Sequence, residues 1–316
     1  MVALTLDGNF ISTDTIPFDI LPGDTVQYTF KQPVDFYHTD FRKEFILGAY
    51  ILSEDENPGD NQFTMAMDVD GDYTGANEWM SYNSCDGMFS DISFSISEDK
   101  NGNIWSTDFY GASRFDGTIW TTYTDEDGLG EAYNWDLLKD HNGNLWFSGT
   151  QDSTITKYDG ETFTVYNVTG NFGECIYEDA QGNVWFGSYE GDGVARFDGQ
   201  SWTYFSTAEI GCGTTVVSIT EDKEGNILLI SYDNTGTVFA FDGSSWTQLL
   251  LPAPANNVVF SELFLDSKGK VWLAGSGLIG VFDGVEWFFF NQEDGIPYYC
   301  DDISEDSYGN IWFGGI

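Results

Sequence analysis

A block of about forty residues recurs along most of the chain and restricts the folds open to it. Each copy carries an Asp-x-x-Gly-Asn turn followed by an aliphatic residue and Trp, then Phe-Asp-Gly or Tyr-Asp-Gly, then a segment that begins with Trp or Phe. The central Asp of the second motif falls at residues 116, 159, 198, 242 and 283. A sixth copy begins at Glu305 and contains only the first motif. Repeats of this length are supersecondary units that bury their apolar faces by stacking on their neighbours.

Each copy has room for four short strands and little else. In the first copy, residues 91–97 alternate apolar and polar side chains, and a glycine turn leads to a second strand at 104–107. A third strand would run into Phe-Asp-Gly, and a fourth would carry Trp120 and Tyr123. Helical spacing of apolar residues is absent, which excludes a helical solenoid. We therefore predict an all-β chain whose main part is a β-propeller of four-stranded blades, with five full repeats and a partial sixth.

The two ends of the repeat region are irregular. Trp79-Met-Ser-Tyr82 copies the fourth strand of a repeat, but the first three strands do not precede it, and the last repeat stops after its second strand. An unclosed ring would leave unpaired strand edges. We therefore expect that the propeller is truncated at its C-terminal end and that the natural protein continues beyond residue 316.

The repeat motifs resemble those of a known family. Gly309-Asn-Ile-Trp-Phe-Gly314, Arg196-Phe-Asp-Gly199 and Trp120-Thr-Thr-Tyr123 with its following Asp-Gly-Leu are similar to the two-component regulator propeller repeat of Bacteroidetes. The chain departs from that pattern at Leu228, where Trp is usual, and at Lys270, where Asn is usual. The resemblance implies a bacterial protein that is extracellular, exposed on the cell surface or periplasmic.

The first part of the chain has a different pattern. Strand-like segments at 2–6, 25–30, 45–52 and 63–67, with Leu21-Pro-Gly-Asp-Thr25, are similar to immunoglobulin-like modules of bacterial surface proteins. We expect an immunoglobulin-like β-sandwich at 1–72, an acidic linker at 73–77 and the propeller at 78–316.

The charge balance limits the partners. The chain has 52 Asp and Glu residues against 11 Lys and Arg, a net charge of −41. Such a field repels nucleic acid and anionic membrane surfaces, so nucleic acid is excluded as a partner. No window approaches the eighteen apolar residues of a membrane span, so we expect no membrane insertion in this segment. Cations, calcium included, are the ions that this balance favours.

One acidic segment resembles a calcium loop. Asp68, Asp70 and Asp72 alternate as calcium ligands do, although Tyr73 stands where such a loop requires glycine. Calcium at these residues is the one cofactor indicated, and a polar linker is the alternative interpretation. Cys85, Cys175, Cys212 and Cys300 show no Cys-x-x-Cys pair, which argues against zinc, and the sequence does not choose among their three pairings.

The repeated acids and tryptophans are interpreted as structural. The Asp residues of both motifs precede glycine turns, where Asp accepts hydrogen bonds from the backbone, and the repeated Trp residues would pack between blades. The first set is Asp99, Asp140, Asp179, Asp222, Asp266 and Asp306, and the second is Asp116, Asp159, Asp198, Asp242 and Asp283.

Catalysis has little support. The chain has two histidines, His38 and His141, and none of the nucleophile, zinc-protease or phosphate-loop motifs. The lyases that open streptogramin antibiotics have a similar propeller repeat and use a histidine general base. We place His141 in a surface turn, which argues against that activity, whereas pairs of carboxylates leave a lyase or hydrolase at the channel mouth as an open alternative.

The loops between the second and third strands of the blades differ from copy to copy, as expected of a binding surface on a fixed frame. We predict a ligand site there, at the mouth of the channel, for a carbohydrate, a peptide or a protein. Its candidate residues are Asp108, Tyr110, Gln151, Asp152, Tyr189, Glu190, Tyr232 and Asp233. The function expected is non-enzymatic ligand recognition or scaffolding in an exported bacterial protein. The alternatives are the periplasmic sensor region of a hybrid two-component histidine kinase and a channel-mouth lyase or hydrolase.

Overall fold

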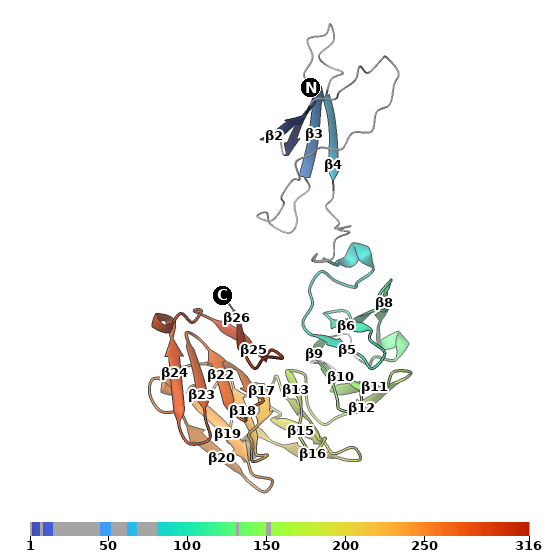
Figure 1. Ribbon diagram of the computed structural model, residues 1–316. Coiled ribbons are helices and arrows are strands. Elements are labelled where there is room, and N and C mark those ends of the chain that lie inside the picture. The colour runs from blue at the N-terminus through green and yellow to red at the C-terminus, as the bar shows by residue number, and fades with distance from the viewer. Residues whose placement is uncertain are drawn as a thin grey trace. The chain divides into compact units, whose positions relative to one another are not determined.

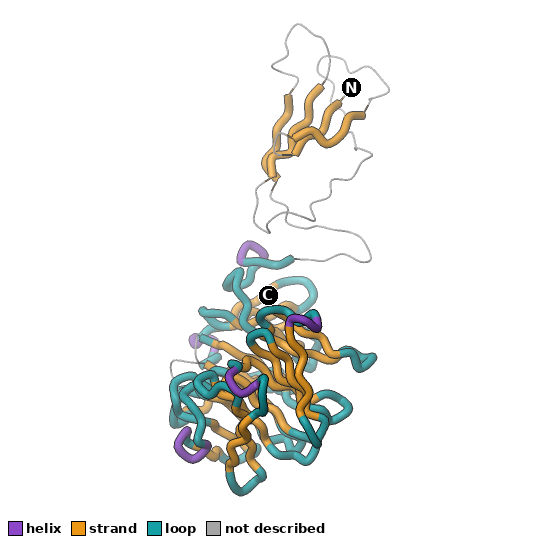
Figure 2. The backbone as a smooth tube through the Cα atoms, turned by 90° about the vertical axis from the view of Figure 1, so that its left-hand side faces the viewer, coloured by secondary structure: helices purple, strands orange, loops and turns teal. Residues whose placement is uncertain are grey.

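The computed structural model describes residues 81–130, 133–149 and 153–315, and four strands nearer the N-terminus (Figures 1 and 2). The chain forms two compact units, Met1–Ser81 and Tyr82–Ile316. In the part of the chain described, no helix has both the length and the apolar character that a membrane crossing requires.

The described strands of the first unit form an antiparallel sheet in the order β2-β1-β3-β4. Its strands are β1 (Val2–Leu6), β2 (Asn9–Asp14), β3 (Phe45–Ile51) and β4 (Gln62–Met67). The immunoglobulin-like character of this unit stays a prediction. Asp68, Asp70, Asp72 and the predicted linker at 73–77 lie outside the described residues.

The second unit is the predicted β-propeller, with five four-stranded antiparallel blades and a two-stranded sixth. In each blade the strands are called A, B, C and D in chain order. Blade 1 consists of β5 (Ile96–Glu98), β6 (Ile104–Thr107), β7 (Ala112–Phe115) and β8 (Trp120–Tyr123). Blade 2 consists of β9 (Asn134–Lys139), β10 (Leu145–Gly149), β11 (Thr154–Tyr158) and β12 (Phe163–Asn167). Blade 3 consists of β13 (Cys175–Glu178), β14 (Val184–Gly187), β15 (Val194–Phe197) and β16 (Trp202–Phe205).

The later blades repeat this plan. Blade 4 consists of β17 (Val216–Glu221), β18 (Ile227–Ser231), β19 (Thr237–Phe241) and β20 (Trp246–Leu250). Blade 5 consists of β21 (Phe260–Leu265), β22 (Val271–Gly275), β23 (Leu278–Phe282) and β24 (Trp287–Asn291). Blade 6 consists of β25 (Cys300–Glu305) and β26 (Ile311–Gly315). The A strands of successive blades contact one another, and the D strands form the outer edges (Figure 1).

The repeated tryptophans pack between blades, as predicted. Trp105 of blade 1 is fully buried in a cluster with Phe147 and Tyr158 of blade 2. The ring centroids of Trp105 and Tyr158 lie 5.0 Å apart. Trp185 makes the same contact with Phe241 of the following blade at 6.0 Å. Large aromatic surfaces therefore join neighbouring blades at the junctions that carry the repeated Trp.

The repeated turn Asp has a second partner that the sequence pattern does not reveal. In blade 2 the Asp140 carboxylate accepts the backbone N–H of Asn142 at 3.0 Å and that of Asn144 at 2.8 Å. It also accepts the indole N–H of Trp146 at 2.9 Å. The same indole bond forms at Asp99, Asp179, Asp266 and Asp306. The turn therefore both closes the A–B hairpin and satisfies the buried indole nitrogen.

A glutamate one residue before the turn Asp connects adjacent blades. Glu178 accepts the backbone N–H of His141 at 2.7 Å, and Glu305 accepts that of Ser267 at 2.7 Å. Glu221 accepts the backbone N–H of Ala180 at 3.1 Å. In blade 5 this position is Leu265, which has no acceptor. We call this repeated contact the blade latch.

The blade latch gives a first testable prediction. Glu221→Ala should lower the free energy of unfolding by about 1–2 kcal/mol, because the backbone N–H of Ala180 loses the buried Glu221 carboxylate as its acceptor. Urea denaturation followed by tryptophan fluorescence measures this. Glu98→Ala is the matched control, since Glu98 occupies the same position in blade 1 and is exposed. Equal losses in the two variants would contradict the latch.

The start of the propeller differs from the prediction. Residues 91–97 were expected to form strand A of blade 1, but β5 spans only Ile96–Glu98. The strand-D-like segment at 79–82 is described only from Ser81, and residues 81–83 are not a strand. Tyr82 nevertheless packs on Phe115 and Trp120, at centroid distances of 4.9 and 5.6 Å, as Tyr123 packs on Phe163 at 5.6 Å. Its side chain thus occupies the position of a preceding D strand without the ladder of hydrogen bonds.

Candidate functional site

The antiparallel order of the strands brings two sets of loops to one end of every blade. The B–C loops and the D–A loops lie at this end, and the A–B and C–D turns lie at the other. We call the first end the rim face. Its described residues are 108–111, 153, 188–193, 232–236 and 276–277 in the B–C loops, and 124–130, 133, 168–174, 206–215, 251–259 and 292–299 in the D–A loops.

The predicted tyrosines of the B–C loops lie exposed on the rim face. Tyr110, Tyr189 and Tyr232 expose 59%, 48% and 57% of their surface. Tyr298, in the last D–A loop, exposes 72%, and the sequence analysis did not single it out. Glu190 is exposed beside Tyr189. Four aromatic rings on one face give planar apolar contact area that the repeat itself does not need.

The predicted aspartates have different environments. Asp108 is only 1% exposed and accepts the backbone N–H of Tyr110 at 2.6 Å, so it shapes its own loop, and burial raises its pKa. Asp233 is exposed, and its hydrogen bonds from the Thr214 hydroxyl and backbone N–H lower its pKa. Gln151 and Asp152 lie outside the described residues. The site assignment of the whole set stays a prediction.

Contacts between loops of adjacent blades hold the rim face in shape. Thr215 donates its hydroxyl to the carbonyl of Tyr189 at 2.7 Å, and Asp192 accepts the backbone N–H of Asn171 at 2.7 Å. Gly193 has a φ of +88°, and a Cβ there would stand 2.0 Å from the carbonyl oxygen of Phe205. Only glycine fits this close approach. The tyrosines therefore project from loops that are fixed by neighbouring backbone.

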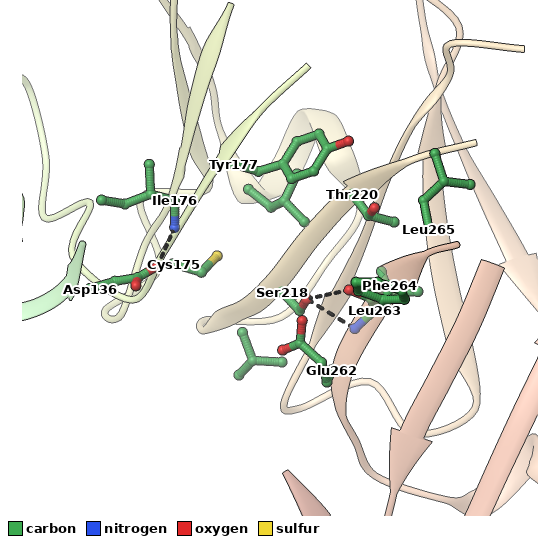
Figure 3. Close-up of a pocket in the computed structure, with 12 residues that line it drawn as sticks. Asp136, Cys175, Ile176, Tyr177, Ser218, Thr220, Glu262, Leu263, Phe264 and Leu265 are labelled. Carbon is green, nitrogen blue, oxygen red and sulfur yellow. Dashed lines mark hydrogen bonds between the residues drawn. The ribbon is translucent and has the colours of Figure 1, made fainter. Parts of the chain in front are cut away.

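A cavity of about 290 Å³ lies between the inner strands β9, β13, β17 and β21 (Figure 3). This volume is near the lower end of the range for small-molecule sites. Its polar lining includes Asp136, Cys175, Ser218 and Glu262, and its apolar lining includes Leu263. Ser218 accepts the backbone N–H of Leu263 at 3.0 Å, and Asp136 accepts that of Ile176 at 2.8 Å. The polar lining thus also joins one inner strand to the next.

The polar lining repeats at one position of the sequence, four residues before each turn Asp. Successive blades carry Ser95, Asp136, Cys175, Ser218, Glu262 and Asp302 there. The sequence analysis missed this position because its residue type changes in every copy, although a polar or sulfur-containing residue is present each time. Alignment of the inner strands on the turn Asp is the signal that finds it.

The carboxyl groups in and near the cavity have raised pKa values. Burial and the nearby Asp302 raise the pKa of Glu262 to about 8. Burial and Asp136 raise the pKa of Glu174 to about 7, and burial also raises the pKa of Asp136. Burial raises the pKa of the Cys175 thiol well above its ordinary value, so this thiol is a poor nucleophile. Near neutral pH the carboxyl groups of Glu174 and Glu262 can donate a hydrogen bond when protonated or bind a cation when ionised.

Other candidate chemistry has less support in the structure. Among the described residues, no group of three His, Cys, Asp or Glu side chains is arranged to hold a metal ion. None of the four cysteines is in a disulfide. His141 lies in an exposed A–B turn, as predicted, with Nδ1 2.5 Å from Glu178, which raises the His141 pKa. It is at the end of the blade opposite the rim face.

Comparisons with known proteins support the repeat and the fold. Residues 168–190 match the family model described as two component regulator propeller. No curated protein matches the sequence. The extracellular domain of a protein named as a hybrid two component system of B. thetaiotaomicron is 23% identical, with a TM-score of 0.58, over 70% of this chain and 31% of that one. This chain therefore spans less than a third of that domain.

Two other solved structures share the fold. Virginiamycin B lyase from Staphylococcus aureus is 17% identical with a TM-score of 0.57, over 70% of this chain and 76% of the lyase. PorZ, a surface component of the type-IX secretion system of Porphyromonas gingivalis, is 14% identical with a TM-score of 0.57, over 85% of this chain and 41% of PorZ. At these sequence identities the similarity shows a shared propeller fold and nothing beyond the fold.

Proposed function

Because the chain carries the two component regulator propeller repeat, we propose that its propeller is a ligand-recognition module of an exported bacterial protein. The ligand binds on the rim face, over the cavity between the inner strands. The observation that carries this proposal is the set of exposed rim tyrosines, Tyr110, Tyr189, Tyr232 and Tyr298, in blades whose inner strands also enclose a cavity with polar walls. Exposed aromatic residues beside a concave polar site are typical of recognition surfaces.

The proposal includes binding without turnover. The cavity lining includes no histidine. One of its carboxyl groups has a structural role, because Asp136 accepts a hydrogen bond from the backbone N–H of Ile176 in the next blade. A location outside the cytoplasm belongs to the same proposal and is supported by the extracellular domain and the surface protein that share this fold.

A sensor region of a hybrid two-component histidine kinase is the second candidate function. The repeat match and the likeness to the extracellular domain of a hybrid two component system favour it. In that version ligand binding on the rim face would bias a kinase to which the propeller is connected. A surface scaffold and a sensor share the same binding step, so the same experiment tests both.

Tyrosine variants test the binding face. A panel of oligosaccharides and synthetic peptides is screened by thermal shift, and affinities of hits are measured by calorimetry. The double variant Tyr189→Ala/Tyr232→Ala should weaken binding at least tenfold, because truncated aromatic anchors typically cost about 1–2 kcal/mol each. Tyr308→Ala is the matched control, since Tyr308 is 89% exposed but lies in the A–B turn of blade 6.

Two results would overturn the proposal. One is a hit whose affinity responds to Tyr308→Ala and not to the rim variant, which would place recognition at the other end of the blades. The other is chemical conversion of a panel member that Glu262→Gln abolishes, which would make the protein a channel-mouth enzyme.

A further inference from the structure

The basic side chains of the propeller are confined to places away from the rim face. Lys100, Lys139, Lys223, Lys268 and Lys270 lie in or next to the A–B turns. There Lys100 donates to the carbonyl of Asp159 and Lys268 to that of Gly309. Arg114, Lys157 and Arg196 lie on C strands over Trp rings of their own blades, at 5.9, 5.4 and 5.5 Å. These eight are all of the Lys and Arg residues in the described part of the propeller.

The rim face carries charge of one sign. The described residues of its loops include eleven Asp and Glu residues and no Lys or Arg. The other end of the blades is different, because the A–B turns mix both signs, as at Lys223 and Glu224, whose charged atoms lie 3.7 Å apart. The field of the rim face is therefore negative throughout, whereas that of the opposite face is partly compensated. A negative face attracts cations and repels anionic polymers.

The exposed tyrosines are a second feature of the rim face that favours a cationic ligand. The face of a tyrosine ring attracts ammonium and guanidinium groups, and the attraction is worth about 0.5–1 kcal/mol at exposed sites. The propeller already contains such pairs, with Arg114 5.6 Å from the ring of Tyr123. On the rim face, Tyr110, Tyr189 and Tyr232 are exposed and have no basic residue in their own loops.

The cavity between the inner strands has groups that a cation would satisfy. Asp136 and Glu262 line it from β9 and β21, on opposite sides of β13 and β17 (Figure 3). Oε2 of Glu174, just before β13, is buried and makes no hydrogen bond. No Lys, Arg or His lines the cavity. A slender side chain that ends in a charged nitrogen fits a space of about 290 Å³ and would neutralise the repulsion among these acids.

We infer that the rim face binds a cationic peptide segment, with one Lys or Arg side chain entering the cavity toward Asp136 and Glu262 and others lying on the exposed tyrosines. The inference rests on the proposed function and names its ligand class. It selects a basic peptide over a neutral glycan on the grounds of charge complementarity.

The probe is a peptide with fluorescein on its N-terminus, fluorescein-(Gly-Lys-Ser)₃-amide, measured by fluorescence anisotropy at 150 mM NaCl against the full chain. The same peptide with acetylated lysines and a Glu-for-Lys version are the ligand controls. The double variant Asp136→Asn/Glu262→Gln should weaken binding of the Lys peptide at least tenfold. Glu161→Gln/Glu224→Gln removes two exposed charges from the opposite end and should change the affinity less than twofold.

The outcomes separate the inference from the proposed function. Equal losses in the two double variants would mean attraction by the overall charge and would overturn the inference, as would equal binding of the acetylated peptide. Rim-dependent binding of a neutral oligosaccharide without binding of the Lys peptide would overturn the cationic ligand and leave ligand recognition by the rim face standing. If neither class of ligand responds to the Tyr189→Ala/Tyr232→Ala variant, both proposals are wrong.

Discussion

Replacing Asp140 with alanine is expected to lower the free energy of unfolding by about 3 kcal/mol. The buried carboxylate accepts two backbone N–H groups, the Asn144 side chain and the indole N–H of Trp146. Removing it leaves these donors without an acceptor in a region where Asp140 is only 6% exposed and Trp146 1%. Urea denaturation, monitored by tryptophan fluorescence and by far-ultraviolet circular dichroism, measures the loss.

The chain contains its own control for the indole bond. In blade 4 the Trp is replaced by Leu228, and Asp222 makes the same turn contacts to Glu224 and Asn226 without an indole partner. Asp222→Ala should therefore cost about 1 kcal/mol less than Asp140→Ala, the typical contribution of one hydrogen bond. If both substitutions cost the same, the indole bond adds nothing and the Asp is only a turn residue.

The second large effect is on the pH dependence of stability. In the unfolded chain Glu262 has an ordinary pKa of 4.5, and in the folded protein burial and Asp302 raise it to about 8. The folded state therefore binds more protons than the unfolded state between these values, and stability falls as the pH rises through this window. Glu174, with a pKa of about 7 in the folded protein, acts in the same direction up to that pH.

Glu262→Gln should remove the part of this dependence that is due to Glu262. At pH 5 the variant and the parent should be about equally stable, because the parent residue is protonated and neutral when folded. At pH 9 the variant should be more stable by about 3 kcal/mol. The shift of the Glu262 pKa, at about 1.4 kcal/mol per pH unit, would give a larger difference, but Glu262 keeps some contact with solvent and the effect is reduced. Urea denaturation at both pH values measures the difference.

Glu224→Gln is the control, since this carboxylate is on an exposed A–B turn, with 59% of its side chain accessible. It should leave the pH profile unchanged. A Glu262→Gln variant that is no more stable than the parent at pH 9 would show that the cavity relaxes or hydrates enough to accommodate the charge.

The blade architecture can be predicted from the sequence because its motifs repeat. Four short strands per copy, the glycine turns and the packing role of Trp105, Trp146 and Trp185 all follow from motifs that recur in fixed order, and the structure confirms them. The indole bond to the turn Asp was not predicted, because the six-residue separation of Asp140 and Trp146 gains meaning only when the A–B hairpin is folded.

The site was predicted less completely. Tyr110, Tyr189 and Tyr232 are exposed in loops that vary between copies, which is the signal that identified them. Asp108 was indistinguishable from them in the sequence, because burial of a loop carboxylate depends on how its loop folds back. The cavity residues Asp136 and Glu262 lie within strands, and their proximity results from stacking of the inner strands of separate blades. No single repeat contains that information.

The junction between blades 4 and 5 lacks the blade latch, since Leu265 stands where the other junctions have a glutamate or a lysine. An apolar cluster that includes Leu228, Phe260 and Leu273 joins the two blades, together with the hydrogen bond from the backbone N–H of Leu263 to Ser218. Apolar contacts weaken on cooling, whereas hydrogen bonds to backbone amides do not depend on the hydrophobic effect. The stability of the junction between blades 4 and 5 should therefore depend on temperature differently from that of the neighbouring junctions. We expect cooling to weaken this junction first.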